Sequence, residues 1–268
     1  MHRRIPLKLL QIVENWYLNC WTYIKWKSST SHWFQINYGV RQGSVLSPFL
    51  FAIYVDNIVK CLKTGQQCYI VMYADDILLL APSVTELQRI VWACELELTS
   101  LDMTINANKS YCVRIGQRRN LDCADLITLN GQIVPCVDEI RYLGIYFTSH
   151  VRFRCVIDHA KRAFYRSANE IFGKVGRSAP EQVTLQLLAS KCIPILLYGL
   201  EACDLNKSTR ASLDFPVIRF AMKLFKTANV GIVEECLEYF GILKPSAILT
   251  KKEYKFEAKI SSSVNYLL

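Results

Sequence analysis

Two adjacent carboxylates, Asp75 and Asp76, stand between two apolar runs in the stretch "QCYIVMYADDILLLAP". Neighbouring side chains diverge in an extended chain, so the pair is poorly arranged for general acid–base catalysis. A divalent cation would cancel their repulsion, and with a third carboxylate such a site can hold two metal ions for phosphoryl transfer. The alternative is an ordinary solvated turn, because aspartate favours turns.

The apolar runs around the aspartates predict two short strands, residues 69–72 and 77–80, joined as a tight hairpin with the carboxylates at its tip. Ser83 and Glu86 have the spacing of a capping box, which predicts that a helix follows the hairpin. The carboxylates would therefore be held at the end of a sheet that a helix can cover.

The rest of the chain mixes helical and strand patterns, which predicts an α+β fold. A glycine-bearing loop at 39–46 leads into a helix for which Ser47 is the expected N-cap and Pro48 the first residue. The other expected elements are a helix over 5–20, a β-hairpin over 21–38, strand-like segments within 103–116 and 126–147, and basic helices from about 151 onward.

Charge is distributed unevenly along the 268 residues, whose formal net charge is +9. Residues 1–50 carry six Lys/Arg and one Asp/Glu, residues 51–150 carry eight and eleven, and residues 151–268 carry eighteen and eleven. Basic flanks suit a polyanion and an acidic middle suits a metal site, although many proteins are mildly basic without binding nucleic acid.

The stretches "GVRQGSVLSPFLFAIYVDNI", "YADD", "INANKS" and "RYLGIYF" occur in this order. Together they resemble the palm of reverse transcriptases, most of all those of non-LTR (LINE-type) retrotransposons. The resemblance implies an antiparallel palm sheet with packed helices over residues 1–150, a helical thumb over 151–250 and a polar tail over 251–268. It implies an RNA template, a DNA primer and dNTP as partners, and Mg²⁺ or Mn²⁺ as cofactor of the complete enzyme.

The resemblance also assigns roles to individual residues. Asp75 and Asp76 would bind metal, and Lys109 would be the general acid for the pyrophosphate leaving group, with a surface lysine as the alternative. The residues expected to contact template and nucleotide are Arg41, Gln42, Gly43, Ser44, Tyr73 and Asn106.

A second group of expected residues would hold the primer and the duplex. Tyr142, Leu143 and Gly144 match the motif that grips the primer end, with a core position as the alternative for Leu143. Lys161, Arg162 and Arg166 recur along one predicted helix and could meet phosphates, although each could equally lie on a solvated face.

One family motif has no counterpart in this sequence. The helix that follows the first catalytic aspartate of the family corresponds to the helix beginning near Ile5, and no carboxylate precedes Glu14. Asp56 falls within a predicted helix and is not expected to replace it. We therefore expect an N-terminally truncated fragment with little or no polymerase activity, so whether this chain is itself an enzyme stays open. The alternative is a non-catalytic remnant that binds nucleic acid.

Other classes of protein fit the sequence less well. A metal-dependent phosphohydrolase would need histidines or further acids near the hairpin, and the four histidines follow no ligand spacing. The apolar runs are too short to span a bilayer and the N-terminus does not read as a signal peptide, so we expect an intracellular protein, in nucleus or cytoplasm, and no membrane partner. The eleven cysteines lack C-x-x-C spacing, which favours reduced, mostly buried thiols.

Overall fold

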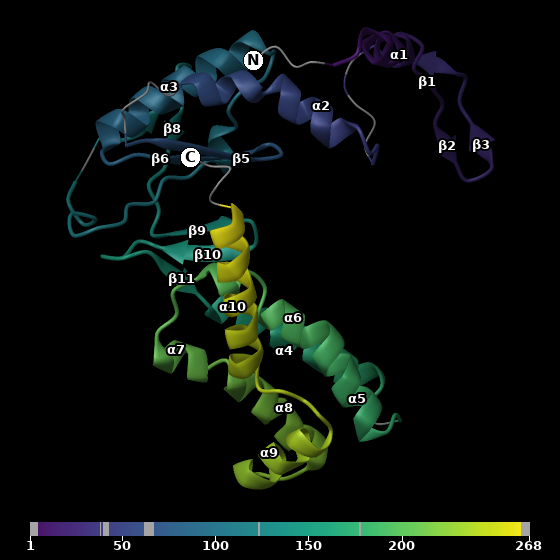
Figure 1. Ribbon diagram of the computed structural model, residues 1–268, viewed down its shortest axis with the longest axis vertical. Coiled ribbons are helices and arrows are strands. Elements are labelled where there is room, and N and C mark those ends of the chain that lie inside the picture. The colour runs from purple at the N-terminus through teal and green to yellow at the C-terminus, as the bar shows by residue number, and fades with distance from the viewer. Residues whose placement is uncertain are drawn as a thin grey trace. The chain divides into compact units, whose positions relative to one another are not determined.

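The computed structural model (Figure 1) describes residues 5–37, 39, 43–61, 67–122, 124–176 and 178–263. Helices are combined with small antiparallel sheets in these residues, which is the α+β character that the sequence predicts. The chain divides into two compact units, Met1–Thr104 and Ile105–Leu268, and each is described by itself. The expected division into palm and thumb near residue 150 is a functional one and stays a prediction.

The first unit begins with a helix and a small hairpin. The hairpin predicted over 21–38 is present, with Lys25 paired to Thr30 near its turn and Trp21 paired to Gln35 at its base. The elements of this unit are α1 (Leu7–Leu18), β1 (Trp21–Thr22), β2 (Lys25–Trp26), β3 (Ser29–Thr30), β4 (Phe34–Gln35), α2 (Ser47–Tyr54), a 3-10 helix (Asp56–Cys61), β5 (Tyr69–Tyr73), β6 (Asp76–Leu80) and α3 (Val84–Ser100).

The helix after the glycine-bearing loop differs from its prediction at both ends. Ser47 is the first residue of α2 rather than its cap, and the capping position is taken by Leu46. The α-helix ends at Tyr54, because Val55 adopts φ −92° and ψ 2°, and the chain tightens into the 3-10 helix that Asp56 opens. Asp56 thus lies at an element boundary, exposed, and not within a continuous helix.

The hairpin that carries the two aspartates matches its prediction closely. Strands β5 and β6 pair from Tyr69–Leu80 at the base to Tyr73–Asp76 at the tip. Ser83 caps α3 by accepting a hydrogen bond from the Glu86 backbone N–H at 3.2 Å. Helix α3 packs on β6 and buries one face, which stabilises a two-stranded sheet that would be marginal alone.

Helix α1 exposes its apolar side chains. None of its residues is buried, and Leu7, Ile12 and Leu18 are each more than 60% exposed. Trp26 in the neighbouring hairpin is 74% exposed. An apolar surface of this extent is typical of a face that packs against other macromolecules.

The second unit contains a three-stranded sheet ordered β11–β10–β9 and a helical core. Its elements are a 3-10 helix (Ala107–Lys109), β7 (Leu126–Ile127), β8 (Ile133–Val134), β9 (Glu139–Tyr142), β10 (Ile145–Thr148), β11 (Arg154–Val156), α4 (Asp158–Lys174), α5 (Glu181–Leu187), a π-helix (Leu188–Cys192), α6 (Ile193–Leu196), a 3-10 helix (Leu200–Ala202), α7 (Lys207–Ala211), α8 (Asp214–Phe225), α9 (Val230–Tyr239) and α10 (Pro245–Ser263). The segment expected as a polar tail therefore begins inside α10.

Large side chains from α4, α5, the π-helix, α6, α8, α9 and α10 meet in one hydrophobic core. Phe164 of α4, Leu188 of the π-helix and Leu249 of α10 are completely buried. Arg210 of α7 ties the outer surface of the core to α10, because its two terminal nitrogens donate to the two carboxylate oxygens of Glu253 at 2.6 and 2.7 Å. Within the described part of the chain, no helix is long and apolar enough to cross a bilayer.

The helix α5 continues into α6 through the π-helical turn Leu188–Cys192. Pro194 lies two residues after the last residue of this turn. Proline lacks the backbone N–H that a regular α-helix would use at this position to donate a hydrogen bond to the preceding turn. The wider turn accommodates this missing donor, and the chain then leaves the helix at Leu197 through Gly199, whose φ is +68°.

The oxidation state of one pair of cysteines differs from the prediction. Cys155 of β11 and Cys203 form a disulfide, with their Cα atoms 6.3 Å apart, so the expectation of reduced thiols is wrong there. Forty-eight residues separate the two cysteines, and only the packing of β11 against the segment after α6 brings them together. Among the other described cysteines, Cys20, Cys68, Cys94 and Cys192 are buried as expected.

Cys192 is expected to resist alkylation in the native chain. Its side chain is fully buried, its thiol donates to Ser167 Oγ at 3.3 Å, and burial raises the pKa of the thiol above its ordinary value. Peptide mass spectrometry after iodoacetamide treatment should show Cys192 reacting about a hundredfold more slowly than the exposed Cys136. Equal rates would contradict this packing of the π-helical turn.

Candidate nucleic-acid interface

The two aspartates lie at the tip of the β5–β6 hairpin. Ala74 and Asp75 form its two-residue loop, and Asp76 begins β6 opposite Tyr73. Both carboxylates are exposed, and Tyr73 is 63% exposed. Ala74 has φ +51°, a left-handed conformation that two-residue hairpin loops require and that is strained for alanine. Strain of this kind is concentrated at functional sites.

The side chains at this tip offer carboxylate oxygens, which are the type of ligand atom that suits a hard divalent cation. Carboxylate oxygens are the ligands that Mg²⁺ and Mn²⁺ prefer. In the described residues, however, no three His, Cys, Asp or Glu side chains come together to hold a metal ion. The hairpin tip therefore supplies two exposed carboxylates, and their role in metal binding stays a prediction.

The other residues expected near the nucleotide are placed as follows. Arg41 and Gln42 lie outside the described residues. Gly43 has φ +80° in an open turn, and Ser44 follows it, partly exposed. Each of these positions stays a prediction.

Asn106 and Lys109 flank one short element of the second unit. Asn106 precedes the 3-10 helix Ala107–Lys109 and is exposed. Its backbone carbonyl accepts from the Lys109 N–H at 3.0 Å, which closes the turn. The Lys109 side chain is exposed, so its ammonium is available to a ligand.

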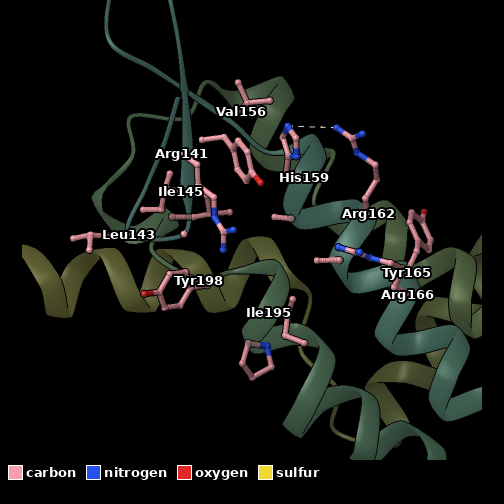
Figure 2. A pocket seen from close by; sticks show the side chains of 16 residues that line it. Arg141, Leu143, Ile145, Val156, His159, Arg162, Tyr165, Arg166, Ile195 and Tyr198 are labelled. Carbon is pink, nitrogen blue, oxygen red and sulfur yellow. Dashed lines mark hydrogen bonds between the residues drawn. The ribbon is translucent and has the colours of Figure 1, made fainter. Parts of the chain in front are cut away.

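A groove of about 1060 Å³ opens in the second unit. The hairpin β9–β10 lines one side of it, α4 lines another, and the segment from α6 to Leu200 closes the end. Sixteen residues line it (Figure 2): Arg141, Leu143, Gly144, Ile145, Tyr146, Val156, His159, Ala160, Arg162, Ala163, Tyr165, Arg166, Pro194, Ile195, Tyr198 and Leu200. Three of these sixteen residues are arginines, and none is a carboxylate.

The arginines give the groove a positive surface. Figure 2 shows the guanidinium groups of Arg141 and Arg166 directed into the groove, and that of Arg162 directed toward His159. Arg162 Nη2 lies 3.5 Å from His159 Nε2. Arginine forks match the geometry of phosphate oxygens, so the groove is suited to a polyanion.

His159 organises the rim of the groove. Its ring stacks on Tyr146, with centroids 3.6 Å apart and planes at 4°. Its Nε2 lies 2.8 Å from Glu139 Oε1 and 3.5 Å from Arg162 Nη2. Arg141 stands 5.8 Å from the Tyr146 ring on the neighbouring strand. Aromatic and cationic groups therefore alternate along this edge.

The tip of the β9–β10 hairpin carries the predicted primer-grip residues. Leu143 and Gly144 form a two-residue loop with φ +48° and +85°, between the paired residues Tyr142 and Ile145. Positive φ at both loop positions is the geometry of a type I′ turn, which matches the twist of the strands. Leu143 is 37% exposed and lines the groove, so it lies at a tip and not in the core.

The structure separates the three basic residues predicted on α4. Arg162 and Arg166 line the groove, as Leu143 and Gly144 do. Lys161 points elsewhere, because its ammonium donates to Ser212 Oγ at 2.9 Å. Lys161 thus stabilises the contact of α4 with the segment before α8.

Three groove residues were missed by sequence reasoning. His159 precedes Arg162 and Arg166 by three and seven positions, which is the spacing of one helix face, and this signal could have found it. Arg141 immediately precedes the predicted grip residues. Tyr198 lies in "LLYGLEA", where nothing in the local pattern distinguishes it from a core residue.

Gly199 stands between two residues that line the groove, Tyr198 and Leu200, at a position where a side chain would not fit. Its φ is +68°, and a Cβ there would lie 2.4 Å from Ile145 Cδ1. We expect Gly199→Ala to lower the free energy of unfolding of the chain by about 2 kcal/mol, of which roughly 1 kcal/mol is left-handed strain. Chemical denaturation measures this difference.

Gly241 provides the matched control, because it has nearly the same φ, +67°, and nothing lies within 4 Å of the position that a Cβ on it would take. Gly241→Ala should show the strain alone. Ile145→Val removes Cδ1 and should recover part of the Gly199→Ala loss. Equal losses for the two alanine variants would contradict the close packing of Gly199 on β10.

Comparison with known proteins now identifies the class. Residues 3–147 match the family model described as Reverse transcriptase (RNA-dependent DNA polymerase). The matched segment is more than half of the chain and includes both aspartates. The chain belongs to the reverse transcriptase family, which confirms the resemblance drawn from its motifs.

Similar proteins come from mobile elements of insects. The chain is 29% identical over 164 residues to the Retrovirus-related Pol polyprotein from type-2 retrotransposable element R2DM of Drosophila melanogaster, covering 56% of the chain and 16% of that protein. It is 30% identical over 187 residues to the RNA-directed DNA polymerase from mobile element jockey of Drosophila funebris, covering 65% and 20%. The chain spans less than a third of the length of these relatives.

Proposed function

We propose that this chain provides the palm and thumb of an RNA-directed DNA polymerase of a non-LTR retrotransposon, and that its groove holds the primer strand paired with an RNA template. The positive groove is the observation that carries this proposal. It brings the predicted grip residues Leu143 and Gly144 together with Arg162 and Arg166. Backbone phosphates would meet the arginines, as in other interfaces where phosphate contacts set position.

The residues expected to bind the metal ions and to contact the nucleotide or template, Asp75, Asp76, Tyr73 and Ser44, lie in the first unit. Asp75 and Asp76 would hold Mg²⁺ or Mn²⁺ together with a third carboxylate, and the metal would stabilise the charge that develops on the transferred phosphoryl group. Tyr73 and Ser44 would contact the incoming dNTP or the template. Lys109 would donate a proton to the pyrophosphate that leaves.

A second candidate function is nucleic-acid binding without catalysis. The groove favours it, because its lining residues lie in the second unit and include neither aspartate. The two functions differ in one respect. A polymerase regains activity when a third carboxylate is supplied to the site, whereas a binding remnant does not.

Fluorescence anisotropy with a labelled DNA primer annealed to an RNA template tests the proposal. We expect binding that weakens steeply as salt rises, with the logarithm of affinity falling by about 0.7–0.9 for each phosphate contact per tenfold increase in salt. Asp75→Asn and Asp76→Asn should bind as the wild type does. Absence of salt-sensitive binding by the wild-type chain would overturn the assignment of the groove.

A further inference from the structure

Tyr198 is exposed in a segment that otherwise packs into the core. Leu196, Leu197 and Leu200 are at most 2% exposed, whereas Tyr198 is 60% exposed. The residue follows α6 directly and lines the groove at its end (Figure 2). Its side chain therefore contributes little to the core, and its position calls for another explanation.

The ring is held against the tip of the β9–β10 hairpin. Tyr198 Cε1 lies 3.0 Å from the position that a Cβ on Gly144 would take, so the ring edge packs on the Gly144 backbone. The adjacent Gly199 packs on Ile145, the next residue of the same hairpin. These two contacts fix the ring at the edge of the groove while most of its surface stays in contact with solvent.

The other tyrosines of the groove are engaged by protein partners. Tyr146 stacks on His159 at 3.6 Å, and Tyr165 meets Phe164 edge to face at 5.7 Å. Both are partly buried. Among the tyrosines that line the groove, Tyr198 is thus the exposed one, and it lines the same groove as Leu143 and the arginines.

An exposed ring in a groove that arginines also line is a stacking surface for a nucleobase. Bases inside a duplex are already covered on both faces, so such a ring can stack only on a terminal or unpaired base. We propose that Tyr198 stacks on the terminal base of the nucleic-acid strand held in the groove. The groove then prefers a strand end that carries a base, and this inference rests on the proposed binding function.

Two matched DNA probes test the stacking contact. Both probes are duplexes with a single unpaired nucleotide at one 3′ end. This nucleotide is thymidine in one probe and an abasic nucleotide in the other. The phosphates are identical, so a difference in Kd reports the base alone. For the wild-type chain we expect the thymidine probe to bind about tenfold more tightly, a preference in the range found for base–aromatic stacking.

Variants assign this preference to the ring. Tyr198→Leu should bind both probes with the affinity of the wild type for the abasic probe, and Tyr198→Phe should keep the tenfold preference. Tyr254→Leu is the control, because Tyr254 lies on α10, is 75% exposed and does not line the groove. It should also keep the preference.

The outcomes separate the two proposals. If the wild-type chain binds both probes equally, or Tyr198→Leu keeps the preference, the stacking role is wrong while the binding function stands. If neither probe binds in a salt-sensitive manner, the proposed function fails with it. Photo-crosslinking of 5-iododeoxyuridine at the overhang gives a readout that does not depend on the folding of a variant. A crosslink on Tyr198 is expected, and crosslinks confined to other residues would overturn the proposal.

Discussion

A polypeptide of these 268 residues is expected to show little or no measurable extension of a DNA primer on an RNA template. Its hairpin tip brings two carboxylates, Asp75 and Asp76, and no third metal-binding side chain joins them within the described residues. Two-metal phosphoryl transfer depends on ion placement, and removing one charge-stabilising group costs roughly 10²–10³ in rate for comparable oxyanion sites. Gel analysis of primer extension with Mg²⁺ and with Mn²⁺ measures the rate.

The aspartates themselves provide the control for this experiment. Asp75→Asn and Asp76→Asn should match the wild-type polypeptide at background. A longer polypeptide that supplies an aromatic-flanked aspartate before the helix α1 should extend the primer, and there Asp75→Asn should lower the rate by at least about 10²-fold. Extension by the 268-residue polypeptide that Asp75→Asn abolishes would refute the prediction.

Loss of two groove arginines should weaken primer–template binding on the order of a hundredfold. Arg162 and Arg166 both line the groove, and neither makes an ion pair with a carboxylate among the described contacts. Replacing both with glutamine removes two charge-assisted contacts to phosphate. The slope of log affinity against log salt should also fall by about 2, which anisotropy measured at several salt concentrations would show.

A control variant must lose the same charge elsewhere. Lys174→Gln combined with Arg89→Gln removes two positive charges from exposed positions that pair with Glu170 and Glu86 and do not line the groove. Its affinity and salt slope should stay close to those of the wild type. Equal weakening by both double variants would mean that binding follows net charge alone and that the groove has no special part in it.

Local patterns predicted the hairpin that carries the two aspartates and the helix that follows it. The apolar runs on either side of Ala74 and Asp75 specify β5 and β6 within one residue at each end. Ser83 and Glu86 specify the start of α3. Both signals depend on residues close in sequence, so tertiary packing did not alter them.

Features that depend on distant residues could not be read in this way. The segment "YCVRIG" was expected to be a strand, but Cys112 makes only an isolated bridge to Cys136, because an apolar run becomes a strand only where a partner is available. The contact of Tyr198 with Gly144 joins segments more than fifty residues apart. The groove is therefore a tertiary feature, although Leu143 and Gly144 on its hairpin side were singled out from their motif.

The π-helical turn Leu188–Cys192 sets the angular position of everything that follows it. Each residue of an α-helix advances by about 100° around the axis, and a π-helical turn contains one residue more than an α-helical turn. Pro194 and Ile195 line the groove, and the extra residue of the turn shifts their positions around the helix axis by one residue relative to an unbroken α-helix. Deleting a single residue from this turn would restore the regular helical phase and rotate the groove-closing segment, Tyr198 included, away from the β9–β10 hairpin without changing any side chain that lines the groove.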